Sequence, residues 1–189
     1  AIVLELASVE AERIKTAIVC PPAIYGSGRG PVNKYAMALP FLASSVLKSG
    51  HGIAPKDDYI WNQVHVQDLS NLYLLLIEAA FAGGGNATWG KDAYYFVEAG
   101  ESNWKHVVQT VVQEAKKANL IERDEVKYMN QQDALKSAGP FYALYFSNSR
   151  SKATRAHKLL GWKPTQPSNE QSIKAAVMEE ASKLGLLSK

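Results

Sequence analysis

The sequence predicts an α/β fold, and three apolar runs support this prediction. The run Lys15–Cys20 (KTAIVC) has the composition of a strand that is buried on both faces of a parallel sheet. The runs Gln63–Val66 and Ala93–Val97 also have strand character, and amphipathic helical segments separate the three runs. Because alternating strands and helices are typical of βαβ units, we expect part of a parallel sheet accompanied by helices.

The composition limits the classes of function to consider. The chain has 189 residues, of which 47% are hydrophobic and 21% charged, and no apolar stretch is long enough to cross a bilayer. The formal charge of +3 comes from scattered lysines, which predicts neither nucleic-acid binding nor a membrane anchor. Cys20 is the single cysteine, and no signal-peptide pattern is present, so we expect a cytoplasmic protein without an internal disulfide.

The first twelve residues predict a helix without a capping residue and without an initiator methionine. This helix would lead into the strand at residues 15–20, as in the second half of a βαβ unit. The parallel neighbour of that strand would then lie before Ala1. We therefore expect the chain to be the C-terminal portion of a longer protein.

The middle of the chain predicts three helices. Residues 34–49 have a helical pattern that is interrupted or starts again at Pro40, and a turn rich in Pro and Asp follows. Asp68 is the expected cap of the next helix. Its expected buried residues are Leu69, Leu72, Tyr73, Leu76 and Ile77. Ser102 is the expected cap of the third helix, whose buried face is Trp104, Val107, Val108, Val111, Val112 and Ala115.

The C-terminal third predicts three further helices. One short helix is expected near Gln131–Ser137. A second would be opened by Ser149 or Ser151 and ended by Gly161. The last has a capping box at Ser168–Gln171, followed by an apolar stripe of Ile173, Ala176 and Val177.

Four segments of this sequence resemble, in order and spacing, the C-terminal half of the extended short-chain dehydrogenase/reductase family, the NAD(P)-dependent epimerases, dehydratases and ketoreductases. They are Pro21–Gly28 (PPAIYGSG), Val64–Leu69 (VHVQDL), Gly100–Ser102 (GES) and Lys158–Pro164 (KLLGWKP). The resemblance covers about residues 1–180. It implies remnants of a Rossmann-type parallel sheet in residues 1–30 and 60–100, and a small, mainly helical substrate-binding region in residues 31–59 and 101–189.

The two chemical motifs of that family are absent from this sequence. A GxxGxxG loop receives the dinucleotide at a helix N-terminus, and a YxxxK pair transfers the proton. Here Tyr25 is followed at the same spacing by Arg29, which cannot reproduce the role of lysine. The resemblance therefore implies that NAD or NADP binds mostly outside these residues, that the chain holds no catalytic residue, and that it is inactive alone.

The loop at residues 20–31 (CPPAIYGSGRGP) is the main candidate site. In the family this loop passes beside the nicotinamide ring, so the resemblance implies cofactor contacts for Pro21, Pro22, Ala23 and Ile24. The alternative is that the prolines only stiffen the exit from the sheet. Because Pro31 argues against a helix that opens on the glycines, we expect a mobile turn at a substrate entrance rather than a phosphate-binding loop.

Substrate contacts are expected from Tyr25, Arg29, Asn33, Trp61 and Asn62. Arg29 is the strong anion-binding group of the loop, although a solvated surface arginine is the alternative. Trp61 and Ala23 stand where nucleotide-sugar enzymes of the family have arginine and asparagine. The resemblance thus implies a less charged carbonyl or hydroxyl compound, with Trp61 as a core residue the alternative.

The remaining expectations concern histidines, partners and function. His65 is expected to be packed and hydrogen-bonded in a buried strand, and the four histidines have no metal-site spacing, so we predict no metal. The resemblance implies a small-molecule substrate and a homodimer of the intact protein. The expected function is that of the substrate-binding part of an NAD(P)-dependent oxidoreductase, epimerase or dehydratase. The alternatives are a non-enzymatic NmrA-like regulator that senses dinucleotides and a nucleic-acid-binding module.

Overall fold

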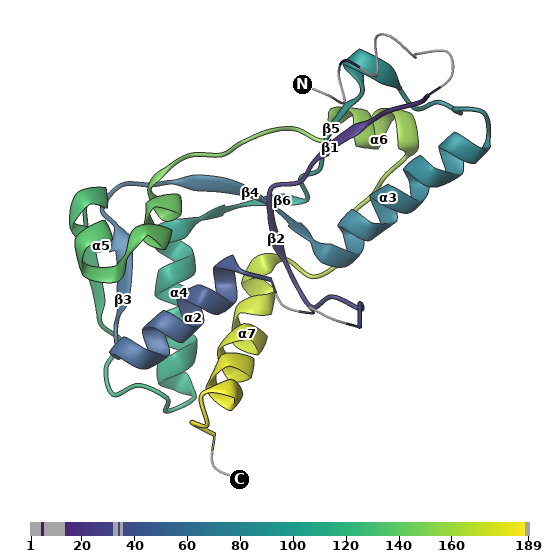
Figure 1. The fold of residues 1–189 in the computed structure, drawn as a ribbon. Helices are drawn as coiled ribbons and strands as arrows, with labels where there is room; N and C mark the ends of the chain where they lie inside the picture. Colours follow the sequence, from purple (N-terminus) through teal and green to yellow (C-terminus); the bar gives the residue numbers. More distant parts are fainter. Residues whose placement is uncertain (1–4, 6–13, 32–33, 35, 188–189) are drawn as a thin grey trace.

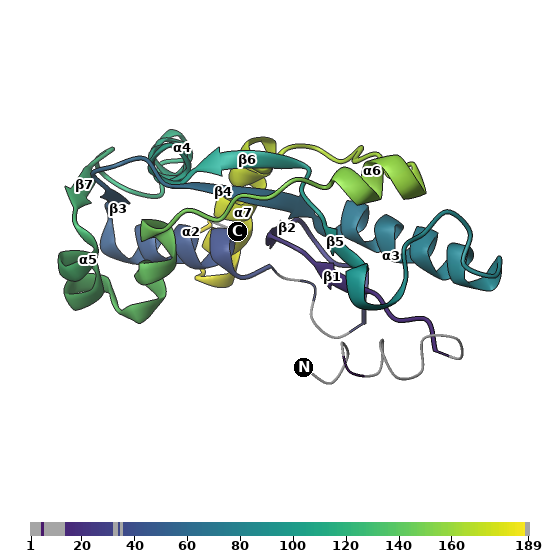
Figure 2. The ribbon, with the colours of Figure 1, turned by 90° about the horizontal axis from the view of Figure 1, so that it is seen from above.

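The computed structural model describes residues 5, 14–31, 34 and 36–187, so the helix expected over residues 1–12 lies, apart from Glu5, outside the described residues. The described part forms two lobes joined by central strands, and it is elongated (Figures 1 and 2). One lobe contains β1, β5, α3 and α6, whereas the other contains α2, α4, α5, α7, β3 and β7. No helix of the described part is long and apolar enough to span a bilayer.

Short strands form three small sheets in the described residues. The strands are β1 (Ile18–Cys20), β2 (Ala23–Tyr25), β3 (Gly52–Pro55), β4 (Ile60–His65), β5 (Tyr94–Phe96), β6 (Gly100–Asn103) and β7 (Val126–Met129). β1 pairs with β5, β2 with β4, and β3 with β7, all in parallel, and β6 adds to β4 antiparallel. The predominance of parallel pairs confirms the predicted α/β class.

The strand expected at residues 15–20 is confirmed only in its second half, as β1 (Ile18–Cys20), and β2 was not predicted. Pro21 and Pro22 interrupt one extended run, so that β1 pairs with β5 in one lobe and β2 pairs with β4 in the centre. A local sequence pattern does not reveal β2, because its hydrogen-bonding partner lies far along the chain. The strands β3, β6 and β7 were missed for the same reason.

The helices largely follow the predicted segments. They are α2 (Ala38–Ser49), α3 (Val66–Phe81), α4 (Trp104–Lys117), α5 (Gln131–Ala138), α6 (Thr154–Leu160) and α7 (Asn169–Lys183), with 3-10 turns at Gly90–Asp92 and Pro140–Phe146. The helix expected over residues 34–49 begins only at Ala38, which places Pro40 in its first turn, where a missing N–H is tolerated. Gly50, with a φ of 74°, ends this helix.

The predicted cap of α3 is wrong. His65 takes that position, and its Nδ1 accepts a hydrogen bond from the Gln67 backbone N–H at 3.1 Å. Asp68 is buried instead, and its carboxylate accepts hydrogen bonds from the backbone N–H groups of Thr165 (2.9 Å) and Gln166 (3.1 Å). Asp68 therefore holds the segment before α7 against the start of α3, a long-range contact that a cap motif cannot reveal.

The other caps differ in part from the predictions. Asn103, not Ser102, caps α4, because residues 100–103 form β6. α6 begins after Ala153 without a side-chain cap, so neither of the two expected serines caps it. The capping box of Ser168 and Gln171 at the start of α7 is confirmed.

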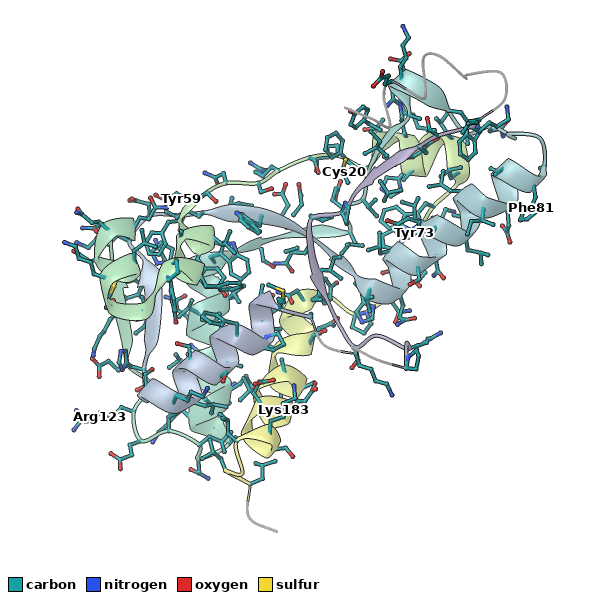
Figure 3. The ribbon with its side chains drawn as sticks, viewed as in Figure 1. Cys20, Tyr59, Tyr73, Phe81, Arg123 and Lys183 are labelled. Carbon is teal, nitrogen blue, oxygen red and sulfur yellow. The ribbon has the colours of Figure 1, made fainter. Side chains whose placement is uncertain are left out.

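Each lobe has its own apolar core. The predicted apolar face of α4 is fully buried in the larger core, with α2 and α7 packed against it. On α3, Leu69, Leu72 and Leu76 are buried as expected, but Tyr73 and Ile77 are about half exposed. Figure 3 shows Tyr73 and Phe81 on the surface of this helix. α6 packs beside β5 and α3, so residues 153–162 return to the smaller lobe.

Candidate binding site at the ends of β2 and β4

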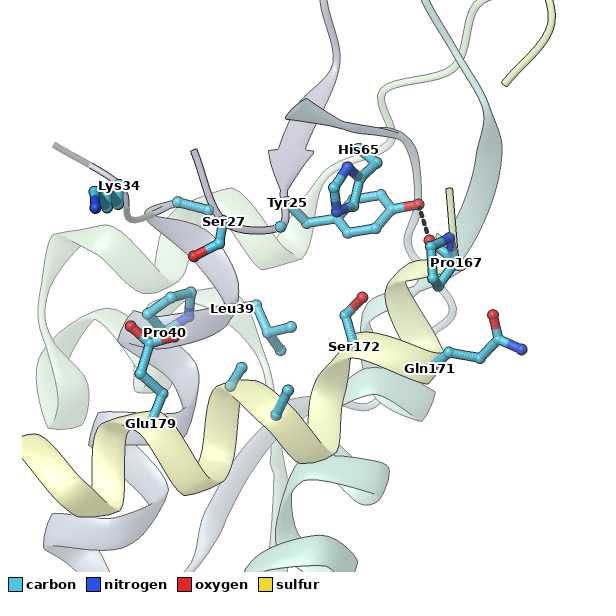
Figure 4. A pocket seen from close by; sticks show the side chains of 14 residues that line it. Tyr25, Ser27, Lys34, Leu39, Pro40, His65, Pro167, Gln171, Ser172 and Glu179 are labelled. Carbon is cyan, nitrogen blue, oxygen red and sulfur yellow. Dashed lines mark hydrogen bonds between the residues drawn. The ribbon is translucent and has the colours of Figure 1, made fainter. Parts of the chain in front are cut away.

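The parallel strands β2 and β4 end side by side at Tyr25 and His65. Ligands of open α/β folds bind beyond the carboxyl ends of such strands. A cavity of about 390 Å³ lies at this edge (Figure 4). It is lined by Tyr25, Gly26, Ser27, Lys34, Ala36, Leu39, Pro40, His65, Pro167, Gln171, Ser172, Ala175, Ala176 and Glu179. The strand ends, the loop after β2, α2 and α7 therefore enclose one candidate site.

The lining of this cavity combines apolar surface with a few polar groups. Leu39 and Pro40 from α2 face small residues of α7. Ser27 and Ser172 contribute hydroxyl groups, whereas Lys34 and Glu179 contribute opposite charges. A cavity of this kind suits a small organic molecule with few hydrogen-bonding groups.

Tyr25 forms the back of the site. Its ring is buried, and its hydroxyl donates a hydrogen bond to the Pro167 carbonyl oxygen at 2.9 Å (Figure 4). Burial, together with the negative charge of Asp68, raises the pKa of Tyr25 to about 12. The phenol is therefore protonated at neutral pH and serves as a hydrogen-bond donor, not as a base.

His65 packs edge-on against Tyr25, with ring centroids 5.3 Å apart and planes at 86°. Burial lowers the pKa of His65 below its ordinary value and the positive charge of Arg29 acts in the same direction, whereas Asp68 opposes them. Since Nδ1 accepts the Gln67 N–H, the neutral ring carries its proton on Nε2. The expectation of a packed, hydrogen-bonded histidine is confirmed.

Two hydrogen bonds and one close approach fix the described part of the loop after β2. Gly26 has a φ of 84°, and a Cβ at this position would clash with the imidazole ring of His65. The Gln67 side chain donates a hydrogen bond to the Ser27 carbonyl oxygen at 3.1 Å. The Gly28 N–H donates to the carbonyl oxygen of Lys34 at 2.8 Å. A glycine at position 26 is therefore required both by backbone conformation and by the close approach of the imidazole.

The other described loop residues that the sequence predicted as contacts do not line the larger cavity. Pro21–Ile24 cross between the two lobes, and the Ile24 side chain is exposed. Ala23 and Ile24 line a second, much smaller cavity that also contacts Tyr25. Arg29 is exposed and does not line the larger cavity, and Asn33 lies outside the described residues.

Trp61 and Asn62 are held by a segment far along the chain. The indole N–H of Trp61 donates to the Ser147 carbonyl oxygen at 2.8 Å, and its ring packs 5.8 Å from that of Trp104. Asn62 is buried, and its side-chain oxygen accepts a hydrogen bond from the Ser151 backbone N–H. These contacts fix the crossing of residues 147–151 over β4, and they do not bring either side chain to the larger cavity.

Sequence patterns missed the contribution of α2 and α7 to the site. Leu39, Pro40 and Ser172 line the cavity, yet each occupies an ordinary helical position in the sequence. The capping box marks where α7 begins, but nothing local indicates that this helix packs beside the loop after β2. Within the described residues, no group of three His, Cys, Asp or Glu side chains is arranged to hold a metal ion.

Comparison with known proteins supports the fold. No family model matches the sequence. The chain is 31% identical over 183 residues to the oxidase ucsJ of an Acremonium species, an alignment that covers 93% of this chain and 53% of the relative. The solved structure of the dTDP-glucose 4,6-dehydratase DesIV from Streptomyces venezuelae, with NAD and TYD bound, matches with a TM-score of 0.65 at 14% identity, over 98% of this chain and 49% of that one.

Two further structures give similar values. RMD from Pseudomonas aeruginosa, complexed with NADPH, has a TM-score of 0.60 at 17% identity, over 96% of this chain and 52% of that one. The UDP-N-acetylglucosamine 4-epimerase of Methanobrevibacter ruminantium, complexed with UDP-N-acetylmuramic acid, has a TM-score of 0.63 at 14% identity, over 96% and 51%. The chain thus spans about half the length of the proteins that it matches.

The parallel strand pairs, their flanking helices and these matches define an α/β chain of Rossmann type. More particularly, the chain has the fold of the NAD-dependent epimerases and dehydratases, over about half of their length. The predicted resemblance to the extended short-chain dehydrogenase/reductases is confirmed at the level of the fold.

Proposed function

We propose that this chain is the substrate-binding portion of an NAD(P)-dependent oxidoreductase, epimerase or dehydratase that acts on a carbonyl or hydroxyl carbon of a small molecule. The observation that carries the proposal is the cavity at the carboxyl ends of β2 and β4. The relatives support it, since RMD was solved with NADPH, DesIV with NAD, and the curated relative is an oxidase.

The segment Pro21–Ile24 fits a role beside a nicotinamide ring. Pro21 and Pro22 have no backbone N–H, so this stretch offers carbonyl acceptors for a carboxamide. No strand of the described part pairs with the outer edge of β2, and the Ile24 side chain exposes apolar surface. When bound, the dinucleotide supplies the hydride-transfer chemistry. The residues of this chain would bind and orient, because the sequence contains neither GxxGxxG nor YxxxK.

The substrate that we propose is small and weakly charged. The larger cavity is mainly apolar, and its two charged lining residues, Lys34 and Glu179, have opposite signs. Arg29 would act from the loop, where its charge already influences His65. Tyr25, Asn33, Trp61 and Asn62 remain proposed substrate contacts, and Trp61 and Asn62 also hold residues 147–151 in place. We also propose that the intact protein is a homodimer and that it is cytoplasmic. Residues 1–30 and 60–100 are proposed to be remnants of the Rossmann-type sheet, and residues 31–59 and 101–189 the substrate-binding region.

The proposal is tested by titration with NADH and NADPH, followed by the fluorescence of the nicotinamide. Two forms are compared. One is the 189-residue chain, and the other, the longer form, is the same chain extended at its N-terminus by the sequence encoded directly before Ala1. We expect dinucleotide binding only in the longer form. Tight binding by the 189 residues alone would overturn the assignment of the cofactor site to another segment, and its absence in both forms would overturn the proposed function.

A substitution pair tests the substrate side. In the longer form, Arg29→Ala is expected to raise the KM for the small-molecule substrate severalfold and to leave the affinity for NADH unchanged. Arg123→Ala is the matched control, because Arg123 is also exposed but lies in the segment between α4 and β7, away from the loop after β2 (Figure 3). Equal effects of the two substitutions would remove Arg29 from the proposed site.

A further inference from the structure

Three buried polar side chains that line the same small cavity each have one atom without a hydrogen-bond partner. Their unpaired atoms are Nε2 of Gln63, Nε1 of Trp104 and Oδ1 of Asn169. The side chains are only 4%, 2% and 5% exposed. Among the described residues, one further buried side-chain atom is unpaired, on Thr16. Because an unpaired buried polar group is costly, folded proteins leave few of them, and three at one place indicate a missing partner.

Helix capping does not account for these residues. Trp104 and Asn169 are the first residues of α4 and α7, but each helix already has a cap. Asn103 caps α4 through its side-chain oxygen, and Ser168 and Gln171 form the capping box of α7. The burial of an unpaired amide oxygen at position 169 therefore has another origin.

The three side chains come from the centre of the molecule. Gln63 lies in β4, where its backbone pairs with Ala23 on one side and Gly100 on the other. Figure 1 shows that α4 and α7 both begin beside the β4–β6 pair and run away from it. Two helix N-termini thus converge there, and their dipoles favour an oxygen atom as the bound group.

The unpaired atoms match the hydrogen-bonding capacity of a hydroxyl group. Gln63 and Trp104 offer two donors, whereas Asn169 offers one acceptor. A hydroxyl oxygen accepts two hydrogen bonds and donates one, so it would satisfy all three atoms. A carbonyl or carboxylate oxygen has no hydrogen to donate and would leave the Asn169 oxygen unpaired.

The dimensions also fit a single oxygen atom. The cavity holds about 10 Å³, close to the smallest volume that accommodates one water molecule. A second cavity of about 90 Å³ shares Tyr25, Gln63 and Asn169 with it. A small molecule in that second cavity could therefore extend one hydroxyl group toward the three atoms.

We propose that Gln63, Trp104 and Asn169 form a binding site for one hydroxyl oxygen. In the free protein the site holds a water molecule, or it takes the hydroxyl group of a small polyol that enters from the neighbouring cavity. The site anchors the first turns of α4 and α7 to β4. It does not depend on the proposed oxidoreductase role, which is tested separately by NADH and NADPH binding.

The experiment uses the indole N–H of Trp104 as a reporter. In NMR spectra of the 189-residue chain, we expect a nuclear Overhauser effect between this N–H and a long-lived water molecule. The indole N–H of Trp162 is the internal control, since it is equally buried but donates to the Asp68 carbonyl oxygen at 2.9 Å. It is expected to show no such signal. Equal behaviour of the two indoles would overturn the proposal.

Two additions identify the occupant and guard against a misfolded variant. Glycerol is titrated as the polyol probe: a shift of the Trp104 signal with loss of its water contact identifies a ligand hydroxyl, and an unchanged signal identifies a water. Gln63→Leu is expected to remove the water contact and lower the Tm, whereas Gln113→Leu, on the exposed face of α4, changes neither. A higher Tm of Gln63→Leu would show that the amide is simply unpaired, and would overturn the proposal.

Discussion

Tyr25 and His65 lie opposite each other in the parallel β2–β4 register, and their rings meet edge to face at 5.3 Å. The Tyr25 hydroxyl is bonded to Pro167, and the Nδ1 atom of His65 is bonded to the Gln67 N–H. Each ring is thus tied by one hydrogen bond to a backbone group outside the pair. The pair therefore forms an anchored end to the two central strands, and the loop at residues 26–31 starts from it.

Gly26→Ala is expected to destabilise the chain by about 2 kcal/mol or more, because it combines a left-handed backbone with a clash against the His65 ring. Urea unfolding measures the change. Gly30→Ala is the matched control in the same loop, where a Cβ meets nothing within 4 Å and φ is not positive. Similar losses for both variants would contradict the role assigned to the Gly26–His65 contact.

Asp68→Asn is expected to lower the free energy of unfolding by about 2 kcal/mol, since the carboxylate accepts charge-assisted hydrogen bonds from Thr165 and Gln166. Chemical denaturation checks the value. Asp57→Asn, an exposed position, is expected to have little effect. We expect faster hydrogen exchange at the backbone amides of residues 165–166 in Asp68→Asn, because their acceptor is weakened. Unchanged exchange there would show that Asp68 acts only as a helix cap.

The stability of the chain is expected to fall as the pH drops below the unfolded-state pKa of histidine, about 6.5. Burial lowers the pKa of His65 in the folded state, so the unfolded chain binds the proton more readily and stability rises with pH across this window. Thermal unfolding of the parent chain and of His65→Gln, compared between pH 7.5 and 5.5, tests the assignment. The Tm of His65→Gln should change less between these two pH values than the Tm of the parent chain.

The pH range in which His65 changes the stability is separate from the range in which the carboxylates do so. Hydrogen bonds to Asn103 and Arg150 lower the pKa of Asp58 and Glu101, respectively, and their protonation belongs to more acidic pH. An identical slope in the parent chain and in His65→Gln would exclude His65 as the group responsible.

Asn62→Ala is expected to cost about 1–3 kcal/mol of stability, because it removes the buried acceptor of the partly buried Ser151 backbone N–H. Asn71→Ala, on the exposed surface of α3, serves as the comparison. A variant at position 62 that is as stable as the parent chain but binds substrate less well would assign Asn62 to direct substrate contact.

The sequence predicted the helices better than the strands. The valine-rich face of α4 and the capping box of α7 are local patterns, and both are confirmed. The strands β2, β3, β6 and β7 are three or four residues long, and two of them, β3 and β6, contain Gly or Pro. Such segments become strands only through partners that lie far along the chain.

The same division applies to the candidate site. Tyr25 could be selected from the sequence, because it stands in an unusual loop directly after a strand. Pro40 and Ser172 could not, since only the packing of α2 and α7 brings them to the cavity. Asp68 shows the opposite case: its position before a helix predicted a cap, but burial and two distant backbone N–H groups gave it another role.

The sequence by itself determined the α/β class, the helical faces and the loop at residues 20–31, because apolar periodicity, helix caps and turn residues act over a few neighbouring positions. Only the tertiary structure decided that this loop contains β2, that Tyr25 meets His65, and that α2 and α7 enclose the cavity. These features depend on parallel pairing and side-chain packing between distant segments. Such contacts form only when the whole chain buries its apolar surface, and no local pattern records them.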